Sequence, residues 1–478
     1  MKREHRIIIR HYRKCHREPV REALERAALN ADVPVEEFID WAFSKMALKF
    51  KEERMDQRIM IENEIRSLGI RFPNGTVNKA YDYKFTMPID KISGIRLEGG
   101  EDYGVALSQD EEGNYHLKGK PFKAGDTKLK LKYFTLDSEP ESELEIPVAF
   151  NPNPRDLWRN IPCSPDLPYP KPDTAIEYVK VETTENGGPR KDIVAASVRG
   201  RSHAQEGKAR DDHFSLHYDK NSEWYVMAVA DGAGSAKYSR KGSEVACKTI
   251  IEHSKRLLSD NSEFEESLQS WAMDRDNEEK RTKVTRYVID IIFKGAIKAH
   301  EAVRKVAEMH PGSILKDYAT TLMFAICKKY EFGWFVASFW VGDGAMAIYD
   351  EKTETVKLLG SPDEGEFSGQ TRFLTMPEIF HDKDVISKRV RMTIVPDFTA
   401  LFLMTDGISD PMFETDKNLN DYSKWKEFYN KLSVGFPEDE IGGVELTDDN
   451  EGSQNQLLKW LEFWSPGNHD DRTIAILY

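Results

Sequence analysis

Apolar residues recur at helical spacing near the start of the chain. One run lies within residues 20–28 and a second within residues 38–46. Residues 30–34, Asn-Ala-Asp-Val-Pro, interrupt the pattern between the two runs. We therefore expect residues 1–68 to form a helical segment that contains a helical hairpin and continues as a charged, solvent-exposed helix.

From residue 72 to residue 150 the pattern changes to short runs of alternating polar and apolar residues. Turn-forming residues separate the runs, as in Pro-Asn-Gly at 73–75. This alternation predicts a small β-sandwich over residues 72–150. Residues 151–173 are crowded with proline, which disfavours helices and central strands alike. We expect them to be a linker from which Leu157 and Trp158 dock on a neighbouring domain.

Residues 174–478 contain four apolar segments that each end in, or border, an aspartate. These pairs are 224–230 with Asp231, 335–342 with Asp343, 400–405 with Asp406, and 473–478 with the preceding Asp470. Carboxylates at the ends of buried strands meet at a sheet edge, where they repel one another unless cations lie among them. Mg²⁺ and Mn²⁺ prefer such oxygen ligands. The pattern therefore predicts a divalent-metal site, although any single Asp-Gly pair is typical of a plain turn.

Between these segments the apolar spacing predicts helices. Residues 282–310 show a long helical pattern that ends at Pro311, and we expect it to pack against a sheet. Cys247 falls inside another apparent helix, where a buried structural thiol is expected.

Composition narrows the possible classes of protein. With 39% hydrophobic and 31% charged residues and no apolar run of about 20 residues, the chain is expected to be soluble, without a membrane partner. The apolar patch Ile7–Ile9 is shorter than the ~7 to 15 residues of a signal peptide core. The net charge of −14 argues against a nucleic-acid partner. Its four cysteines are widely separated, so neither a zinc site nor a disulfide framework is indicated, and the cytoplasm is the expected compartment.

The order and spacing of six motifs resemble one enzyme family. The motifs occupy residues 200–214, 229–236, 318–322, 341–344, 404–410 and 470–473. They are similar to those of the type 2C metal-dependent protein phosphatases, especially the bacterial branch whose second aspartate motif reads DGAGSA. In addition, residues 115–133 resemble the last hairpin of bacterial immunoglobulin-like modules.

The resemblance implies an α+β architecture with four parts. A helical segment (1–68), an immunoglobulin-like β-sandwich (72–150) and the proline-rich linker (151–173) would precede a phosphatase domain over residues 174–478. That domain would be a four-layer αββα sandwich. The implied activity is hydrolysis of phosphoserine and phosphothreonine on proteins, in bacterial signalling, by a water that two Mg²⁺ or Mn²⁺ ions activate. A serine/threonine kinase encoded nearby is the implied functional partner.

The resemblance also assigns metal-binding roles by position. Asp231 would bridge the two metals, with the Gly232 carbonyl on one of them. Asp406 and Asp470 would bind the other metal, and Asp212 would hold metal-bound water. A more weakly occupied third site would use Asp343 and Asp410 together with Asp406. The neighbouring Asp471 is an alternative ligand to Asp470. Strand register favours Asp470.

Several departures from the family pattern leave parts of the site open. Ala233 stands where eukaryotic members have a histidine thought to protonate the leaving group, so solvent or His203 would take that role. Gly207 stands where many members have a phosphate-gripping arginine. Arg201 is the favoured replacement, and Lys208 and Arg210 are the other candidates.

These departures motivate a rival function from another class. A catalytically silent scaffold that binds phosphoproteins would keep the fold without the chemistry. The retained aspartates argue against this rival, because a module freed from catalysis has no physical need to cluster carboxylates.

Overall fold

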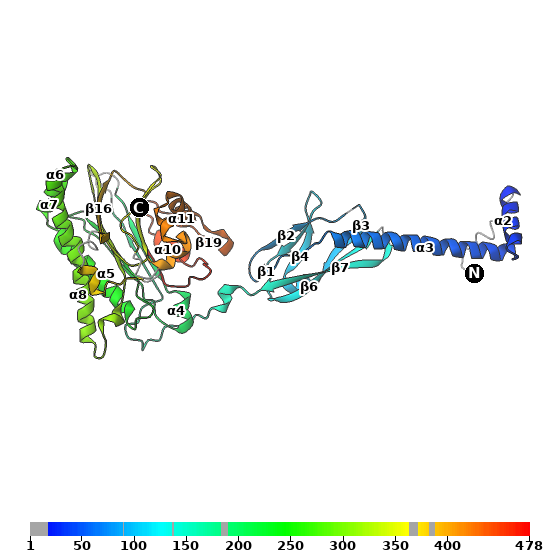
Figure 1. Cartoon of the computed structure of the whole chain (residues 1–478), viewed down its shortest axis with the longest axis horizontal. Coiled ribbons are helices and arrows are strands. Elements are labelled where there is room, and N and C mark those ends of the chain that lie inside the picture. Colours follow the sequence, from blue (N-terminus) through cyan, green and yellow to red (C-terminus); the bar gives the residue numbers. More distant parts are fainter. Residues whose placement is uncertain (1–17, 89, 136–137, 183–189, 363–370, 382–387) are drawn as a thin grey trace. The chain divides into compact units, whose positions relative to one another are not determined.

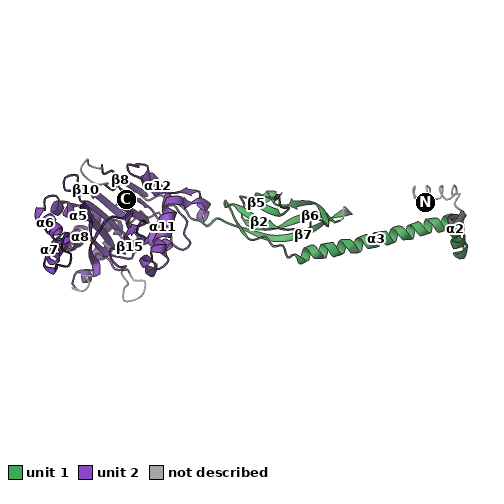
Figure 2. Ribbon diagram, turned by 90° about the horizontal axis from the view of Figure 1, so that it is seen from above, with its two compact units in different colours: residues 1–154 green, residues 155–478 purple. Residues whose placement is uncertain are grey.

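The computed structural model describes residues 18–88, 90–135, 138–182, 190–362, 371–381 and 388–478. The chain divides into two compact units, residues 1–154 and 155–478 (Figures 1 and 2). Among the described residues, no helix combines the length and the apolar character needed to cross a bilayer.

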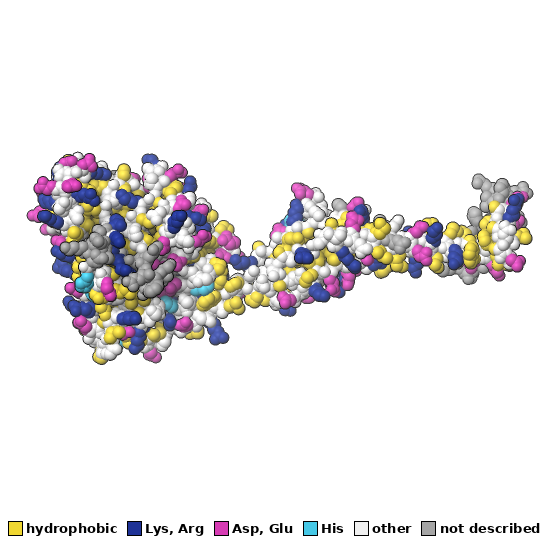
Figure 3. Space-filling model, viewed as in Figure 1, with side chains coloured by type: hydrophobic (Ala, Val, Ile, Leu, Met, Phe, Trp, Pro, Cys, Tyr) yellow, Lys and Arg dark blue, Asp and Glu magenta, His cyan; other side chains and the backbone are white. Residues whose placement is uncertain are grey.

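Two helices begin the first unit. They are α2 (Glu18–Asn30) and the 33-residue α3 (Val35–Ser67), and the predicted break separates them. The predicted hairpin is wrong in its geometry, because α2 lies across the end of α3 instead of folding back along it (Figures 1 and 2). In the break, Asp32 adopts a left-handed φ of 53°, which redirects the chain. Along α3, exposed apolar side chains such as Trp41 and Phe50 are interleaved with charged ones (Figure 3).

Seven strands of the first unit form two small sheets. Their orders are β1-β7-β6-β3 and β2-β5-β4. The strands are β1 (Gly75–Thr76), β2 (Tyr81–Phe85), β3 (Ile92–Glu98), β4 (Val105–Gln109), β5 (Tyr115–Gly119), β6 (Gly125–Thr135) and β7 (Ser138–Asn151). One apolar cluster joins both sheets to Ile61 and Ile65 of α3.

The hairpin predicted over residues 115–133 is absent from the described strands. Strand β5 pairs with β2 and β4 in one sheet, whereas β6 pairs with β3 and β7 in the other. The physical reason is that β6 finds a longer antiparallel partner in β7, and the charged pairs Lys128–Glu145 and Lys130–Glu143 lie across that ladder.

The second unit contains two larger sheets. Their strand orders are β10-β11-β12-β13-β16 and β15-β14-β17-β20-β9-β8. The strands are β8 (Thr174–Val179), β9 (Ile193–Val198), β10 (His213–Tyr218), β11 (Tyr225–Ala230), β12 (Leu322–Tyr330), β13 (Gly333–Val341), β14 (Ala345–Asp350), β15 (Thr355–Leu358), β16 (Val390–Val395), β17 (Ala400–Met404) and β20 (Arg472–Leu477). A short pair, β18 (Gly435–Phe436) and β19 (Ile441–Gly442), lies apart from both sheets.

Helices pack on the sheets of this unit, and a mixed α+β fold is confirmed (Figure 1). Among its described residues the α-helices are α4 (Arg201–Glu206), α5 (Ser239–Leu258), α6 (Ser262–Ala272), α7 (Glu278–Val288), α8 (Lys294–Met309), α10 (Asp406–Phe413), α11 (Tyr422–Val434) and α12 (Ser453–Trp460). One apolar cluster contains residues of α5 to α8 and of β11 to β13. A second contains residues of α10 to α12 and of the sheet that holds β17. A third contains residues of both sheets.

The long helix predicted over residues 282–310 is present as three consecutive pieces. Helices α7 and α8 are joined by a π-helical turn, η3 (Ile289–Phe293), and α8 ends two residues before Pro311. Cys247 is buried within α5, as the sequence predicts.

The proline-rich segment packs with the second unit from Arg155 onward. The Trp158 ring lies 4.5 Å from the His469 ring, measured between centroids, so this tryptophan docks as predicted. Leu157, by contrast, is 66% exposed. The backbone N–H of Ile161 donates to the carbonyl of Ala204, which ties the segment to α4.

Candidate metal centre

Three aspartates from three different strand ends converge. Asp231 follows β11, Asp343 lies just past β13, and Asp406 follows β17 as the first residue of α10. One carboxylate oxygen from each lies within 4.8 Å of the other two. Burial raises the pKa of Asp406, and the negative charges of Asp343, Asp470, Asp212 and Asp410 raise it further. Ionised carboxylates this close together repel one another, so the cluster needs either bound protons or bound cations.

Two threonines hold the backbone of Asp231. Its N–H donates to Thr321 Oγ1 over 2.8 Å, and its carbonyl accepts from the Thr321 N–H and from Thr320 Oγ1, each also at 2.8 Å. The next residue, Gly232, lies in a tight passage, where a Cβ atom would approach the Asp211 carbonyl oxygen to 2.8 Å. A glycine is therefore required at this position for the loop to close.

Asp212 is fully buried behind this cluster. Its Oδ2 accepts a 2.9 Å hydrogen bond from Thr405 Oγ1, whereas its Oδ1 is buried without a hydrogen-bond partner among the described residues. Burial, together with the charge of Asp471, raises the pKa of Asp212 to about 7. Asp343 shows the same pattern, because Thr371 donates to its Oδ2 while its Oδ1 is buried and unpartnered within the described chain.

These orphaned oxygens test whether a metal would fit. Buried polar atoms in folded proteins almost always have a partner, so an unpartnered carboxylate oxygen indicates a missing cation, water or proton. Oxygen-only donors with net negative charge match Mg²⁺ or Mn²⁺ and do not match a soft metal. The residues present therefore fit a hard divalent cation.

Asp470 and Asp471 have different environments. Asp471 is buried, and its Oδ1 accepts from the Gly200 N–H (2.6 Å) and from His203 Nδ1 (3.1 Å). Its Oδ2 accepts from the Asp211 N–H (2.5 Å). Burial alone would raise the pKa of Asp471, but these hydrogen bonds lower it. Both of its oxygens are thus engaged by the protein, whereas Asp470 accepts only the Asp471 N–H at Oδ1 among the described hydrogen bonds.

His203 lies beside this pair on α4. Its ring, Asp470 and Asp471 form a second group whose potential ligand atoms lie within 4.8 Å of one another. Burial lowers the pKa of His203, but the hydrogen bond and charge of Asp471 outweigh burial and raise it to about 9. Nδ1 is held by Asp471, and Nε2 lies 3.9 Å from Asp211 Oδ2.

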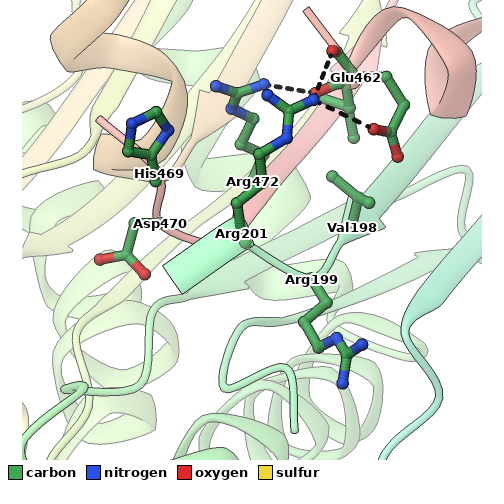
Figure 4. Close-up of a pocket in the computed structure, with 9 residues that line it drawn as sticks. Val198, Arg199, Arg201, Glu462, His469, Asp470 and Arg472 are labelled. Carbon is green, nitrogen blue, oxygen red and sulfur yellow. Dashed lines mark hydrogen bonds and ion pairs between the residues drawn. The ribbon is translucent and has the colours of Figure 1, made fainter. Parts of the chain in front are cut away.

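Arg201 points away from the aspartates. Its guanidinium donates to the Glu462 carbonyl over 3.4 Å and lies over the Trp464 ring, 4.9 Å from the ring centroid. Figure 4 shows the Arg201 side chain directed toward Glu462 and the Asp470 carboxylate directed to the other side. A role for Arg201 in binding phosphate stays a prediction, because this arrangement would require the side chain to swing.

Asp410 completes the acidic group one turn along α10. Burial, and then the charge of Asp343, raises its pKa to about 6. Of the sequence-predicted site residues, the structure gathers Asp231, Asp343 and Asp406 in one group and His203, Asp470 and Asp471 in another. Lys208 is half-exposed and paired with Glu206, and Ala233 is buried with its N–H donating to the Ala319 carbonyl.

Comparison with known proteins decides the family. A sequence model of protein phosphatase 2C matches residues 199–462, more than half of the 478-residue chain. The chain belongs to the protein phosphatase 2C family. No curated protein matches it in sequence.

Solved structures of similar proteins have low sequence identity to this protein phosphatase 2C chain. PppA, a regulatory component of T6SS in Pseudomonas aeruginosa, is 14% identical, with 60% of this chain and 97% of that chain covered and a TM-score of 0.35. The Mycobacterium tuberculosis serine/threonine phosphatase PstP/Ppp is 15% identical, with 60% and 98% covered and a TM-score of 0.34. A PstP catalytic domain in complex with 2 manganese ions is also 15% identical, with 64% and 98% covered and a TM-score of 0.33.

Sequence reasoning missed the residues that support the aspartates. Thr320, Thr321 and Thr405 orient Asp231 and Asp212, and Asp471 organises the backbone around them. Thr405 directly precedes the Asp406-Gly407 pair, so the sequence could have indicated a supporting role for this threonine. The motif at residues 318–322 contains Thr320 and Thr321, but their contacts with Asp231 depend on strand pairing, which the motif does not show.

Proposed function

We propose that this chain is a metal-dependent serine/threonine phosphoprotein phosphatase. The observation that carries the proposal is the convergence of the Asp231, Asp343 and Asp406 carboxylates from three strand ends, where burial and mutual repulsion raise the pKa values of Asp231 and Asp406. Membership of the protein phosphatase 2C family supports the same activity.

The proposed ligands follow from the positions described above. Asp231, the Gly232 carbonyl, Asp406 and Asp470 would hold two Mg²⁺ or Mn²⁺ ions, and Asp212 would orient a water. Asp343 and Asp410, with Asp406, would contribute to a third site. When bound, such ions acidify a shared water and offset charge on phosphoryl oxygens. Asp470 is preferred over Asp471, because both oxygens of Asp471 already accept hydrogen bonds from the protein.

His203 is the proposed proton donor to the leaving alkoxide. The hydrogen bond from Nδ1 to Asp471 fixes the orientation of the His203 ring and stabilises its protonated form. With a pKa raised to about 9, His203 carries a proton that it can donate at neutral pH. Ala233 cannot supply a proton. Among the described residues, His203 is the histidine with a ring nitrogen close to the Asp470 and Asp471 carboxylates. Arg201 remains the candidate for binding the substrate phosphate.

Finer parts of the assignment are also proposals. We propose that residues 174–478 form the four-layer αββα sandwich of the bacterial DGAGSA branch and that residues 72–150 are an immunoglobulin-like module, which two facing sheets support. We propose that the protein acts in the cytoplasm, where the free thiols Cys163, Cys247 and Cys327 would stay reduced. A role in signalling with a cognate kinase is proposed from the family alone.

One assay tests the function. Hydrolysis of para-nitrophenyl phosphate and of a phosphothreonine peptide is measured with Mn²⁺, with EDTA, and for Asp231→Asn. We expect EDTA to abolish activity and the substitution to lower kcat at least about 100-fold, because a carboxylate that would hold the metal ions is lost. Asp260→Asn, at an exposed loop position, is the control. Activity indifferent to metal would overturn the mechanism, and no activity under any condition would favour the silent scaffold.

A further inference from the structure

A five-residue strap precedes the phosphatase fold and touches the loops that carry the metal centre. We define the strap as residues 168–172, Pro-Tyr-Pro-Lys-Pro. It lies outside residues 199–462, which match the family, yet it belongs to the same compact unit. Three of its contacts involve buried polar groups, and each reaches a different part of the site.

The first contact is made by Lys171. Its ammonium donates to the backbone carbonyl of Asp212 (3.0 Å), to that of Asp211 (3.4 Å) and to Ser243 Oγ (3.1 Å). Ser243 Oγ donates in turn to the Asp211 carbonyl over 2.5 Å. The peptide groups that precede and follow the Asp212 Cα are therefore fixed from one side by Lys171 and Ser243.

The second contact is made by Arg240 of α5, which fastens the strap. Its Nε donates to the Pro168 carbonyl (3.0 Å) and to the Tyr169 carbonyl (3.1 Å), and its Nη2 donates to the Pro168 carbonyl (2.7 Å). The same guanidinium lies 3.6 Å from Asp211 Oδ1. Pro168 supplies a carbonyl acceptor but has no backbone N–H group of its own.

The third contact is made by Tyr169. Its hydroxyl lies 3.3 Å from His310 Nδ1 and 3.5 Å from the Tyr318 hydroxyl, and its ring meets the Tyr238 ring edge-on at 5.8 Å between centroids. Tyr318 is two residues before Thr320, whose hydroxyl donates to the Asp231 carbonyl. The strap thus contacts the backbone of Asp212 directly and the Tyr318 side chain, two residues before the Asp231 support Thr320.

The enclosure of the Lys171 ammonium group among protein acceptors needs a reason, because the side chain is only partly exposed. An ammonium group loses hydration when it is buried, and it is retained inside a protein only where acceptors replace the lost water. Here the acceptors are the carbonyls that flank Asp212, whose own carboxylate is held on the opposite side by Thr405. We propose that Lys171 is a positioning residue for Asp212. Lys171 holds the Asp212 backbone in the geometry that metal binding and hydrolysis require. This inference rests on the proposed metal-dependent phosphatase activity.

The test uses the full chain with Lys171→Met, which keeps the stem and removes the donors. Lys180→Met is the matched control, because Lys180 is an exposed lysine paired with Asp449 at 2.9 Å. Titration calorimetry gives the Kd for Mn²⁺, and hydrolysis of para-nitrophenyl phosphate gives kcat and KM. Thermal unfolding gives Tm. We expect Lys171→Met to raise the Mn²⁺ Kd about tenfold and to lower kcat with little change in KM, as loss of groups that orient metal ligands does. Lys180→Met should behave as the wild type.

A purely structural lysine would give a different result. A lowered Tm with Mn²⁺ Kd and kcat within twofold of the wild type, measured well below Tm, overturns the inference while leaving the proposed function intact. A wild-type chain that binds no Mn²⁺ overturns both. If Lys171→Met does not fold, Ser243→Ala is measured instead, because it removes the hydroxyl that joins Lys171 to the Asp211 carbonyl. An unchanged Kd in that variant also overturns the inference, and Lys171→Arg should retain more affinity than Lys171→Met.

Discussion

Thr405 connects two strands and an aspartate through one hydroxyl group. Its Oγ1 donates to Asp212 Oδ2 over 2.9 Å and accepts the Thr473 N–H over 3.0 Å. The residue is 1% exposed, so neither partner can turn to water if the hydroxyl is removed. This hydroxyl therefore links the β17 and β20 strand ends to the orientation of a candidate catalytic carboxylate.

We predict that Thr405→Val destabilises the fold and weakens metal binding together. Valine keeps the shape but leaves the Thr473 N–H unpaired, which costs about 1 to 3 kcal/mol. Urea unfolding gives the stability, and calorimetry gives the Mn²⁺ Kd. Thr282→Val, at an exposed position of α7, is the control and should change stability by less than about 0.5 kcal/mol. Equal stability of the two variants would contradict the role of this hydroxyl.

At the residue scale, the sequence predicted the acidic residues better than their supports. Asp231, Asp343 and Asp406 could be found because an apolar strand ending in aspartate is a local pattern. The roles of Asp471 and Lys171 depend on hydrogen bonds between segments distant in the chain, which no local pattern records. Arg201 illustrates the same limit, because its direction is set by Glu462 and Trp464 far along the chain.

Helix α5 is joined to the π-helical turn η3 by a buried histidine. His253 Nε2 lies 3.1 Å from the Asp290 carbonyl, and its Nδ1 lies 3.4 Å from a guanidinium nitrogen of Arg256. A ring that donates at Nε2 and accepts at Nδ1 must be neutral. Burial lowers the pKa of His253 below its ordinary value of 6.5, and the charges of Lys298 and Arg256 lower it further.

We predict that this contact makes stability depend on pH in the acid range. Because the pKa is lower in the folded chain, below about pH 6.5 the unfolded chain binds a proton at His253 that the folded chain does not bind. The free energy of unfolding therefore falls as the pH drops below about 6.5. Above that pH the contact contributes its whole stabilisation. The loss has a slope of at most about 1.4 kcal/mol per pH unit. His253→Gln, which can keep both hydrogen bonds, should show a smaller loss between pH 7.5 and 5.5 in urea unfolding. Identical losses would refute the assignment.

At the scale of elements, apolar spacing located the helices and strands but not their partners. The helical pattern over residues 282–310 is present in α7 and α8, and the turn η3 between them carries no sequence signal because it keeps nearly the same face buried. The predicted pairing over residues 115–133 was wrong, since alternation marks a strand without naming its neighbour.

The molecule as a whole consists of two compact units that meet in sequence at Pro154 and Arg155. The sequence predicts a phosphatase domain over residues 174–478, and the proline-rich stretch was expected to be a spacer. Proline content shows that a segment is extended but not whether it lies on a surface. Here the buried guanidinium groups of Arg240 and Arg210 donate to carbonyls of the stretch.

We predict that fragments beginning at residues 155 and 174 differ. The fragment 155–478 keeps the strap and should show metal-dependent hydrolysis of para-nitrophenyl phosphate close to that of the full chain. The fragment 174–478 keeps all the motif aspartates but lacks Lys171, so its kcat should be lower and its Mn²⁺ Kd higher by about tenfold. Thermal unfolding of both fragments is the control for folding. Equal kinetics would show that the strap contributes nothing to the site.

The strap also limits how this chain can exchange its N-terminal parts. A phosphatase whose site needed no residue before β8 could accept any preceding module at residue 174. In this chain a recombination event there would remove the contacts to Asp212, whereas one before Arg155 would preserve them. Related chains with different N-terminal modules should therefore carry their junction before the proline-rich stretch, and chimeras built for biosensors should be joined at the same place.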